Sequence, residues 1–215
     1  FTTDGSANYM WMQTFWHHLS DTGTAGIVMA NGAMTSNTKG EKNVRQHMVD
    51  NSMVDCIVRL PDKLFLTTGI PACLFILSKN RDGKDGTHRE RNNEILFLDA
   101  SKMGTMASRK LRVFSDEDIQ RISETYHKWR NTPPLEGQGE DYVDIEGFSK
   151  AATIADVQKQ DYKLTPGIYV GTEAEENDGI PFDEKMEGLK AQLLEQFEKG
   201  EELKERIKAN FDKIL

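Results

Sequence analysis

The chain has 215 residues, enough for one domain with a hydrophobic core and some appended segments. Hydrophobic residues make up 37% and charged residues 29%, a composition typical of globular proteins, and no apolar run approaches the roughly 20 residues that a membrane-spanning helix needs. The net charge of −8 does not indicate nucleic-acid binding.

Apolar periodicity in the first half predicts an α/β protein. The predicted elements are a helix over 8–20, a short buried strand over 26–30, a helix over about 40–51, strands over 53–60 and 72–79 joined by a loop over 61–71, and a strand over 94–100. Aromatic and methionine residues cover much of the first helix, which predicts a helix sandwiched against the sheet. The polar residues 79–93 indicate a solvated connection, and the strands on either side can pair as a hairpin.

Helical patterns replace strands after residue 113. Ser115 is a suitable N-cap for a helix that ends near Arg130, and a short helix is predicted from about residue 153, followed by an irregular arm with a Pro-Gly turn. A long helix is predicted from about Asp183 to Leu215, although Gly200 costs about 1 kcal/mol inside it. The sequence thus divides into residues 1–113, 114–172 and 173–215, the last beginning with an acidic linker.

The long C-terminal helix carries an apolar stripe within an arc of roughly 120°. Its members are Met186, Leu189, Leu193, Phe197, Leu203, Ile207, Phe211, Ile214 and Leu215. A stripe of this width fits a bundle face better than a two-position coiled-coil seam. Packing against another subunit and packing against the rest of this chain would both bury it.

Cysteine usage and the first residues bear on the cellular compartment. Cys56 and Cys73 lie in apolar strand-like runs, which favours buried reduced thiols and a cytoplasmic protein, although a disulfide between neighbouring strands stays open. Without CxxC spacing they indicate no zinc site. The residues FTTDGSANYM lack an initiator methionine and the features of a signal peptide, so we expect a piece of a longer chain.

Several common catalytic motifs are absent from the sequence. It contains no GxGxxG, GxxxxGK[ST], HExxH or GxSxG, which argues against a dehydrogenase, a P-loop NTPase, a zinc protease and an α/β-hydrolase. The five histidines are scattered, and we expect structural or surface roles for them. The residues therefore predict no catalytic group, no metal ligands and no cofactor loop.

The loop over 61–71 is the strongest candidate for a binding site. It runs from a Pro-Asp turn through an aromatic residue to the start of the next strand, and its candidate binding residues are Phe65, Thr68, Gly69, Ile70 and Pro71. An exposed Phe65 could stack on a flat ring such as an extruded base, and Gly69 would let the backbone approach a ligand. The alternative is that Phe65 belongs to the core and that the loop only turns the chain.

Residues 101–112 form a basic stretch without an acid. Its cations are Lys102, Arg109, Lys110 and Arg112.

Five segments resemble the modification subunit of type I restriction-modification systems, an N6-adenine DNA methyltransferase. They are GTAGIVMANGAM (23–34), VDCIVRLPDKLFLTTGIPACLFILSKNR (54–81), EILFLDASKMG (94–104), FSDEDIQRISETYHKWR (114–130) and DYKLTPGIYVG (161–171). The resemblance runs through nearly the whole chain. It implies a partial class I, Rossmann-like methyltransferase sheet followed by a helical C-terminal tail. It further implies an enzyme that uses S-adenosylmethionine and extrudes an adenine from DNA.

The resemblance also implies which parts are missing. The family's glycine-rich cofactor loop and its Asn-Pro-Pro-Phe motif do not occur in this sequence. The chain then corresponds to the C-terminal portion of the subunit. This portion is expected to bind no cofactor and to be inactive alone. Phe65 and residues 68–71 would lie on the target-base side. Under the resemblance, Lys102, Arg109, Lys110 and Arg112 become candidates for contacts with DNA phosphates, and a solvated basic loop with no ligand is the alternative. The implied partners are DNA, a specificity subunit held through the C-terminal helix, and the restriction subunit.

Two other functions remain open from the sequence. One is a non-catalytic binding or assembly module that associates through its C-terminal helix. The other is a Rossmann-like methyltransferase that acts on RNA or protein.

Overall fold

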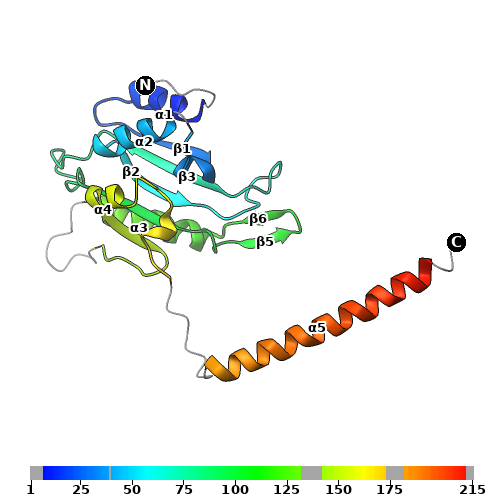
Figure 1. The fold of residues 1–215 in the computed structure, drawn as a ribbon. Coiled ribbons are helices and arrows are strands. Elements are labelled where there is room, and N and C mark those ends of the chain that lie inside the picture. Colours follow the sequence, from blue (N-terminus) through cyan, green and yellow to red (C-terminus); the bar gives the residue numbers. More distant parts are fainter. Residues whose placement is uncertain (1–6, 39, 132–141, 173–181, 212–215) are drawn as a thin grey trace. The chain divides into compact units, whose positions relative to one another are not determined.

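The computed structural model describes residues 7–38, 40–131, 142–172 and 182–211 (Figure 1). They belong to two units, residues 1–174 and residues 175–215, each described here by itself. None of the described helices is long and apolar enough to cross a membrane.

The first unit is built on a five-stranded mixed sheet with the order β1–β3–β2–β4–β7 (Figure 1). The strands are β1 (Thr24–Ala30), β2 (Val54–Arg59), β3 (Ala72–Ser78), β4 (Glu94–Asp99) and β7 (Ser149–Thr153). β2 and β4 are parallel, and the other neighbouring pairs are antiparallel. The predicted hairpin between β3 and β4 is therefore wrong, because β2 lies between them and pairs with both.

Helices cover the sheet on both faces. They are α1 (Asn8–His18), α2 (Glu41–Asp50), α3 (Asp116–Arg130) and α4 (Ile154–Lys159), with two short 3₁₀ helices, Asn31–Met34 and Pro166–Ile168. Side chains alternate across the strands, so that Ile57 packs with residues of α1, α2 and α4 while Val58 packs with residues of α3. The result is a three-layer arrangement with one hydrophobic cluster on each face of the sheet.

Local sequence signals explain α3 well. Ser115 accepts a hydrogen bond from the amide of Asp118, whose carboxylate accepts one from the amide of Ser115. This capping box satisfies two amide groups that a helix start leaves without partners. The two cysteines are also as predicted, since Cys56 and Cys73 are both free and buried.

The N-terminal elements are more exposed than predicted. β1 is an edge strand whose one neighbour in the described sheet is β3, and Val28 on it is 52% exposed. On α1, Tyr9 and Met12 are buried while Trp11 is 60% exposed, so this helix is covered on one side and not sandwiched. The apolar surface of β1 and α1 thus exceeds what the described chain buries.

A buried ion-pair cluster joins β2 to the connection between β3 and β4. Asp55 Oδ1 lies 3.2 Å from the Nε atoms of both Arg81 and Arg91, and Asp55 Oδ2 accepts a 2.7 Å hydrogen bond from the hydroxyl of Tyr126 on α3. All three charged side chains are almost fully buried. Residues 79–93 are therefore not the solvated connection that their polarity predicts.

Backbone carbonyls complete the coordination of the two guanidinium groups. Arg81 donates to the carbonyls of Ser52, Val54, Arg91 and Glu94, and Arg91 donates to those of Asn80, Arg89 and Arg130. Burial lowers the pKa of Arg81 to about 10, with the nearby Asp55 carboxylate opposing that shift. The Asp55 carboxylate is the charged partner that the two buried guanidinium groups share.

A separate two-stranded ribbon, β5 (Thr105–Ser108) and β6 (Leu111–Val113), follows β4 where the sequence predicts only a basic loop. Gly104 precedes it with a φ of +79°, a conformation that residues with a side chain rarely adopt. A Cβ at this position would lie 2.8 Å from the carbonyl oxygen of Val113. Gly104 is therefore required for the chain to turn tightly into the ribbon.

The second unit is described over one helix, α5 (Phe182–Phe211), which continues through Gly200. The stripe residues Met186, Leu189, Leu193, Phe197, Leu203 and Ile207 are each about half exposed. Pairs such as Glu195 and Lys199, 2.6 Å apart, lie one turn from each other on its surface. The stripe members Phe211, Ile214 and Leu215 lie outside the side chains that the structure describes.

We predict that Asp55→Asn lowers the free energy of unfolding by about 3–5 kcal/mol, because it leaves two buried guanidinium groups without a carboxylate. Asp82→Asn is the matched control, since Asp82 pairs with exposed Lys84 and we expect a change within about 0.5 kcal/mol. Urea denaturation measures both values. If both variants lost the same small amount of unfolding free energy, the ion-pair cluster would not be a stabilising constraint.

A second pair of substitutions tests the turn before the ribbon. Gly104→Ala and Gly86→Ala both place alanine at a φ above +70°, which costs about 1–2 kcal/mol, but nothing lies within 4 Å of a Cβ at Gly86. At Gly104 the contact with Val113 adds about 1–3 kcal/mol of overpacking. We expect faster amide hydrogen exchange over 105–113 in Gly104→Ala than in Gly86→Ala, and identical exchange would contradict this account.

Candidate functional site

Three strands end at the same edge of the sheet. β1, β2 and β4 run in one direction, and the register pairs Ala30 with Ala72, Arg59 with Cys73 and Arg59 with Asp99. In open α/β sheets, ligands bind outside the carboxyl ends of such strands. The loop over 61–71 follows β2 and the ribbon follows β4, so both predicted site segments lie at this edge (Figure 1).

The loop over 61–71 places Phe65 at the surface and not in the core. The Phe65 side chain is 39% exposed, and Thr68 donates its amide to the carbonyl of Phe65 at 3.3 Å to close a tight turn. The Thr68 hydroxyl accepts a 3.2 Å hydrogen bond from the amide of Ile70. Leu66, at the tip of the turn, is 83% exposed. The loop therefore presents an aromatic ring and two aliphatic side chains to solvent.

Gly69 and Pro71 lie in the second half of the loop, just before β3. A Cβ at Gly69 would lie 3.7 Å from Lys63 Cγ, an ordinary contact, and its φ is not in the left-handed region. The fold itself therefore does not require a glycine at this position, and its use for close approach of a ligand stays a prediction. Pro71 precedes β3, where the amide of Leu60 donates to the carbonyl of Ala72 at 2.8 Å and closes the base of the loop.

The basic stretch and the loop over 61–71 are in direct contact. The amide of Arg112 on β6 donates a 2.8 Å hydrogen bond to the carbonyl of Lys63. The Arg112 guanidinium donates to Asp62 Oδ1 at 3.5 Å and to the carbonyl of Gly104 at 2.9 Å. The structure thus joins two segments that the sequence analysis proposed separately.

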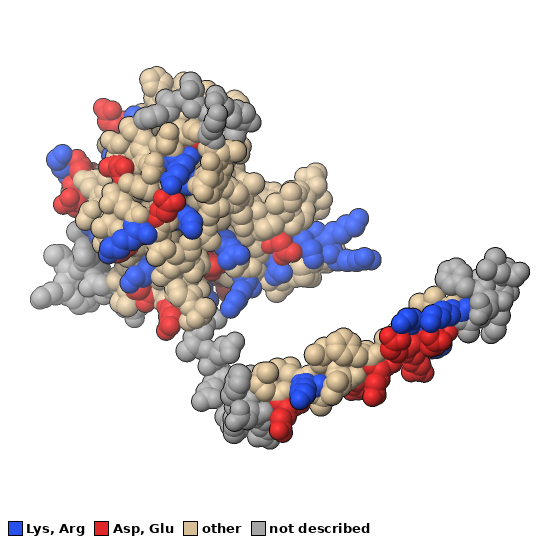
Figure 2. Space-filling view, viewed as in Figure 1, with Lys and Arg blue, Asp and Glu red and all other residues tan. Residues whose placement is uncertain are grey.

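The other three cations of the basic stretch are exposed. Arg109 and Lys110 occupy the turn of the β5–β6 ribbon, and Lys102 lies just after β4. Figure 2 shows Lys and Arg side chains gathered at the free end of the ribbon. An anionic ligand could reach Arg109 and Lys110 without displacing a protein partner that the structure shows.

An ion pair at the same edge was not predicted from sequence. Arg59 Nη1 lies 3.2 Å from Asp99 Oδ2, at the ends of the parallel strands β2 and β4. The turn at Gly167 lies over this pair, because a Cβ there would be 3.4 Å from Asp99 Oδ2. One signal was present in the sequence, since each of these two apolar strands ends in a charged residue.

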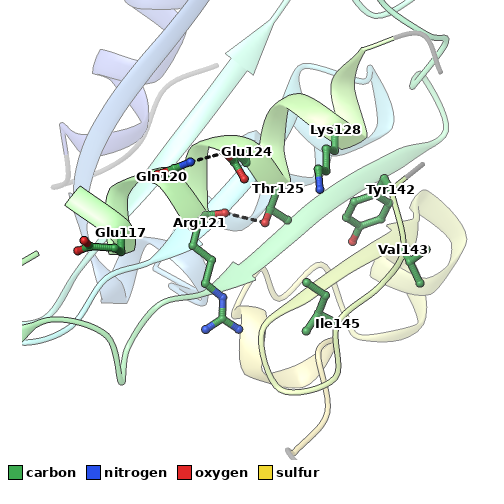
Figure 3. A pocket seen from close by; sticks show the side chains of 9 residues that line it. All are labelled: Glu117, Gln120, Arg121, Glu124, Thr125, Lys128, Tyr142, Val143 and Ile145. Atoms are coloured by element: carbon green, nitrogen blue, oxygen red, sulfur yellow. Dashed lines mark hydrogen bonds between the residues drawn. The ribbon is translucent and has the colours of Figure 1, made fainter. Parts of the chain in front are cut away.

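A groove of about 720 Å³ lies elsewhere, between α3 and residues 142–145 (Figure 3). Its lining residues are Glu117, Gln120, Arg121, Glu124, Thr125, Lys128, Tyr142, Val143 and Ile145. Gln120 donates a 2.6 Å hydrogen bond to Glu124, and the Arg121 guanidinium lies 4.1 Å from the centroid of the Phe148 ring. The groove has mixed charge and shares no residue with the loop over 61–71 or with the ribbon.

The described residues contain no cluster of three or more His, Cys, Asp or Glu side chains that could hold a metal ion. At the carboxyl edge of the sheet, the exposed side chains of the loop over 61–71 and of the ribbon can support recognition of a ligand. An aromatic ring can stack on a planar group, and adjacent cations can bind anionic groups.

Comparisons with known proteins show the family. A sequence model of the N-6 DNA methylase family matches residues 1–178. The type I restriction enzyme HindI methylase subunit of Haemophilus influenzae is 41% identical over 206 residues, which are 96% of this chain and 43% of that protein. The MjaIX methylase subunit of Methanocaldococcus jannaschii is 34% identical over 98% of this chain and 36% of its own length. This chain thus spans about two fifths of the length of these relatives.

Solved structures show a similar fold. The type I methyltransferase subunit from Streptococcus thermophilus aligns with a TM-score of 0.63 and 24% identity over 77% of this chain and 31% of that chain. The type I restriction enzyme EcoKI M protein aligns with a TM-score of 0.55 and 15% identity over 82% of this chain and 41% of its own. The methyltransferase-type α/β sheet with a helical C-terminal segment is thereby confirmed, and the chain belongs to the N-6 DNA methylase family, among proteins similar to the methylase subunits of type I restriction enzymes.

Proposed function

We propose that this chain is the target-base and assembly portion of a type I modification subunit, which as a whole methylates adenine N6 in DNA with S-adenosylmethionine. The observation that carries the proposal is the loop over 61–71, which presents Phe65 at the carboxyl edge of the sheet next to a basic ribbon. The family match and the lengths of the relatives support it. The proposal implies work on DNA in the cytoplasm.

The described residues do not fit S-adenosylmethionine. After β1 the chain enters the 3₁₀ helix Asn31–Met34, after β2 the loop over 61–71, and after β4 the turn at Gly104, which Val113 and Phe114 pack closely. None of these turns is a glycine-rich loop that leads directly into an α-helix and could cradle the cofactor. Methyl transfer requires the methyl donor and the target nitrogen to be held in line, so we propose that this portion alone does not catalyse.

Phe65 would act on the target adenine by stacking. An aromatic ring of this kind contributes about 1–3 kcal/mol per base in complexes with unpaired bases. Thr68, Gly69, Ile70 and Pro71 would form the wall beside the ring. An extruded base is the ligand that fits, because a base inside the duplex offers no free face to a surface aromatic ring.

The exposed apolar surface of β1 and α1 would receive the cofactor-binding part of the sheet. Val28 and Trp11 are more exposed than apolar residues of a completed α/β domain usually are. The edge of β1 also leaves backbone hydrogen-bonding groups available for a further strand. This supports a chain whose described sheet is one side of a larger methyltransferase domain.

The α5 helix would pack on helices of a specificity subunit, within a complex that can also include a restriction subunit. Its half-exposed apolar stripe supports a helical partner, as a bundle needs. The alternative function, a non-catalytic assembly module, rests on the same stripe. The two differ in whether Phe65 and the ribbon contact DNA.

The first test concerns Phe65. A short duplex with 2-aminopurine opposite an abasic site supplies an unpaired adenine analogue whose fluorescence reports stacking. We expect this chain to quench the analogue, and Phe65→Ala to abolish the quenching and weaken binding by about 1–3 kcal/mol. Leu66→Ala is the matched control, because Leu66 is a neighbouring exposed apolar residue. Equal quenching by Phe65→Ala and the unchanged chain would remove the base-side role and favour the assembly module.

The second test concerns the stripe on α5. Leu193 lies in the stripe and Ala191 on the opposite face, and both are exposed. We expect Leu193→Asp to abolish co-purification with a specificity subunit, because a buried unpaired carboxylate costs several kcal/mol, and Ala191→Asp to leave it intact. Circular dichroism checks that both variants keep their helix content. Co-purification of Leu193→Asp at the unchanged level would exclude the stripe as the contact surface.

A further inference from the structure

We propose that Arg112 is a positioning residue that fastens the base-side loop over 61–71 to the β5–β6 ribbon, so that phosphate contacts at the ribbon tip fix the place of Phe65. The inference rests on the proposed function and deepens it. It gives Arg112 a different role from Lys102, Arg109 and Lys110, the candidates for phosphate contacts with which Arg112 is grouped on sequence alone.

The contacts of Arg112 join two segments, residues 103–104 and residues 62–63. Its Nη1 donates to the carbonyls of Met103 and Gly104, at 3.3 and 2.9 Å, at the start of the ribbon. Its Nη2 donates to Asp62 Oδ1 at 3.5 Å, at the start of the loop. Its amide donates to the carbonyl of Lys63 at 2.8 Å. One residue thus holds the base of the ribbon and the base of the loop together.

The loop needs such a support because Lys63 is in a strained conformation. Lys63 has a φ of +60°, which is uncommon for a residue with a side chain and persists only where the surroundings hold it. Both the carbonyl of Lys63 and the carboxylate of the preceding Asp62 are partners of Arg112. Phe65 follows two residues later, so the direction in which its ring points depends on this turn.

The environment of Arg112 does not suit a phosphate ligand. Its side chain is 22% exposed, and the side chains of Arg109 and Lys110 lie at the solvated turn of the ribbon. A phosphate at Arg112 would have to displace two carbonyls and would approach the Asp62 carboxylate. The planar fork of a guanidinium suits several acceptors in fixed directions, a geometry that a lysine ammonium cannot reproduce.

Coupling between DNA contact and base contact follows from this arrangement. The ribbon and the loop leave neighbouring parallel strands, β4 and β2, and lie side by side (Figure 1). If the Arg112 contacts are lost, the ribbon can still bind phosphates, but the position of Phe65 is no longer set by that binding. The expected defect is therefore in base stacking and not in the number of phosphate contacts.

The experiment compares Arg112→Ala, Arg112→Lys and Asp62→Asn with Arg109→Ala and Lys110→Ala in the 215-residue chain. Anisotropy titrations of the 2-aminopurine duplex between 50 and 200 mM NaCl give the slope of log K against log salt, and saturating titrations give the quenching. We expect the slope to fall by about 1 in Arg109→Ala and in Lys110→Ala, with quenching at saturation retained. For Arg112→Ala and Asp62→Asn we expect an unchanged slope and at least a twofold loss of quenching.

Arg112→Lys keeps the charge but not the fork, so we expect it to resemble Arg112→Ala. A slope reduced by about 1 in Arg112→Ala, with full quenching in Arg112→Lys, would make Arg112 a phosphate ligand and overturn the proposal.

Amide hydrogen exchange of the free chain tests the fastening without DNA. We expect exchange over residues 61–71 to be at least tenfold faster in Arg112→Ala than in the unchanged chain. Exchange over α3 should stay the same, and Lys110→Ala should match the unchanged chain throughout. Unchanged exchange over 61–71 in Arg112→Ala would overturn the inference even if DNA binds. Absence of DNA binding by all variants, with faster loop exchange, would instead contradict the proposed function.

Discussion

The buried carboxylate of Asp55 is the constraint on which the first unit depends. It lies on β2, the strand between β3 and β4, and it pairs with two arginines from the connection that joins those strands. Its second oxygen binds Tyr126 on α3. Removing one partner of a buried ion pair costs far more than the intact pair contributes, because the remaining charge cannot regain water. The cluster therefore favours the one topology that brings both arginines to Asp55, in which β2 separates β3 from β4.

That topology also determines where the site segments lie. Because β2 is parallel to β4, the loop after β2 and the ribbon after β4 emerge at the same edge of the sheet. A hairpin of β3 with β4 would make these two strands antiparallel neighbours, and the carboxyl end of β4 would no longer adjoin that of β2. The contact between Arg112 and Asp62 would then be impossible. The buried Asp55 cluster at the start of β2 thus favours the topology in which Asp62 and Arg112 meet beyond the end of β2.

Sequence reasoning succeeded where the signal is local. The capping box at Ser115 and the apolar runs of β2, β3 and β4 can each be recognised within a few residues, and the resemblance of residues 54–81 identified the family. It failed where the stabilising partner is distant, as for Arg81 and Arg91, whose carboxylate lies 26 and 36 positions earlier in the chain. β5, β6 and β7 were missed because they are short and partly polar, so that pairing and not composition makes them strands.

Under the proposed function, the charge distribution would also let the ribbon orient bound DNA. The segment from Ala100 to Val113 carries four cations and no acid, while the chain as a whole has a net charge of −8. At physiological ionic strength, charges act over about 8 Å, so the ribbon would act on a duplex as a local cationic patch. If DNA binds at the tip of the ribbon, as we propose, a contact surface of this size would favour a single direction of approach. Because Arg112 joins that ribbon to the loop, the direction that brings phosphates to Arg109 would also bring the duplex toward Phe65.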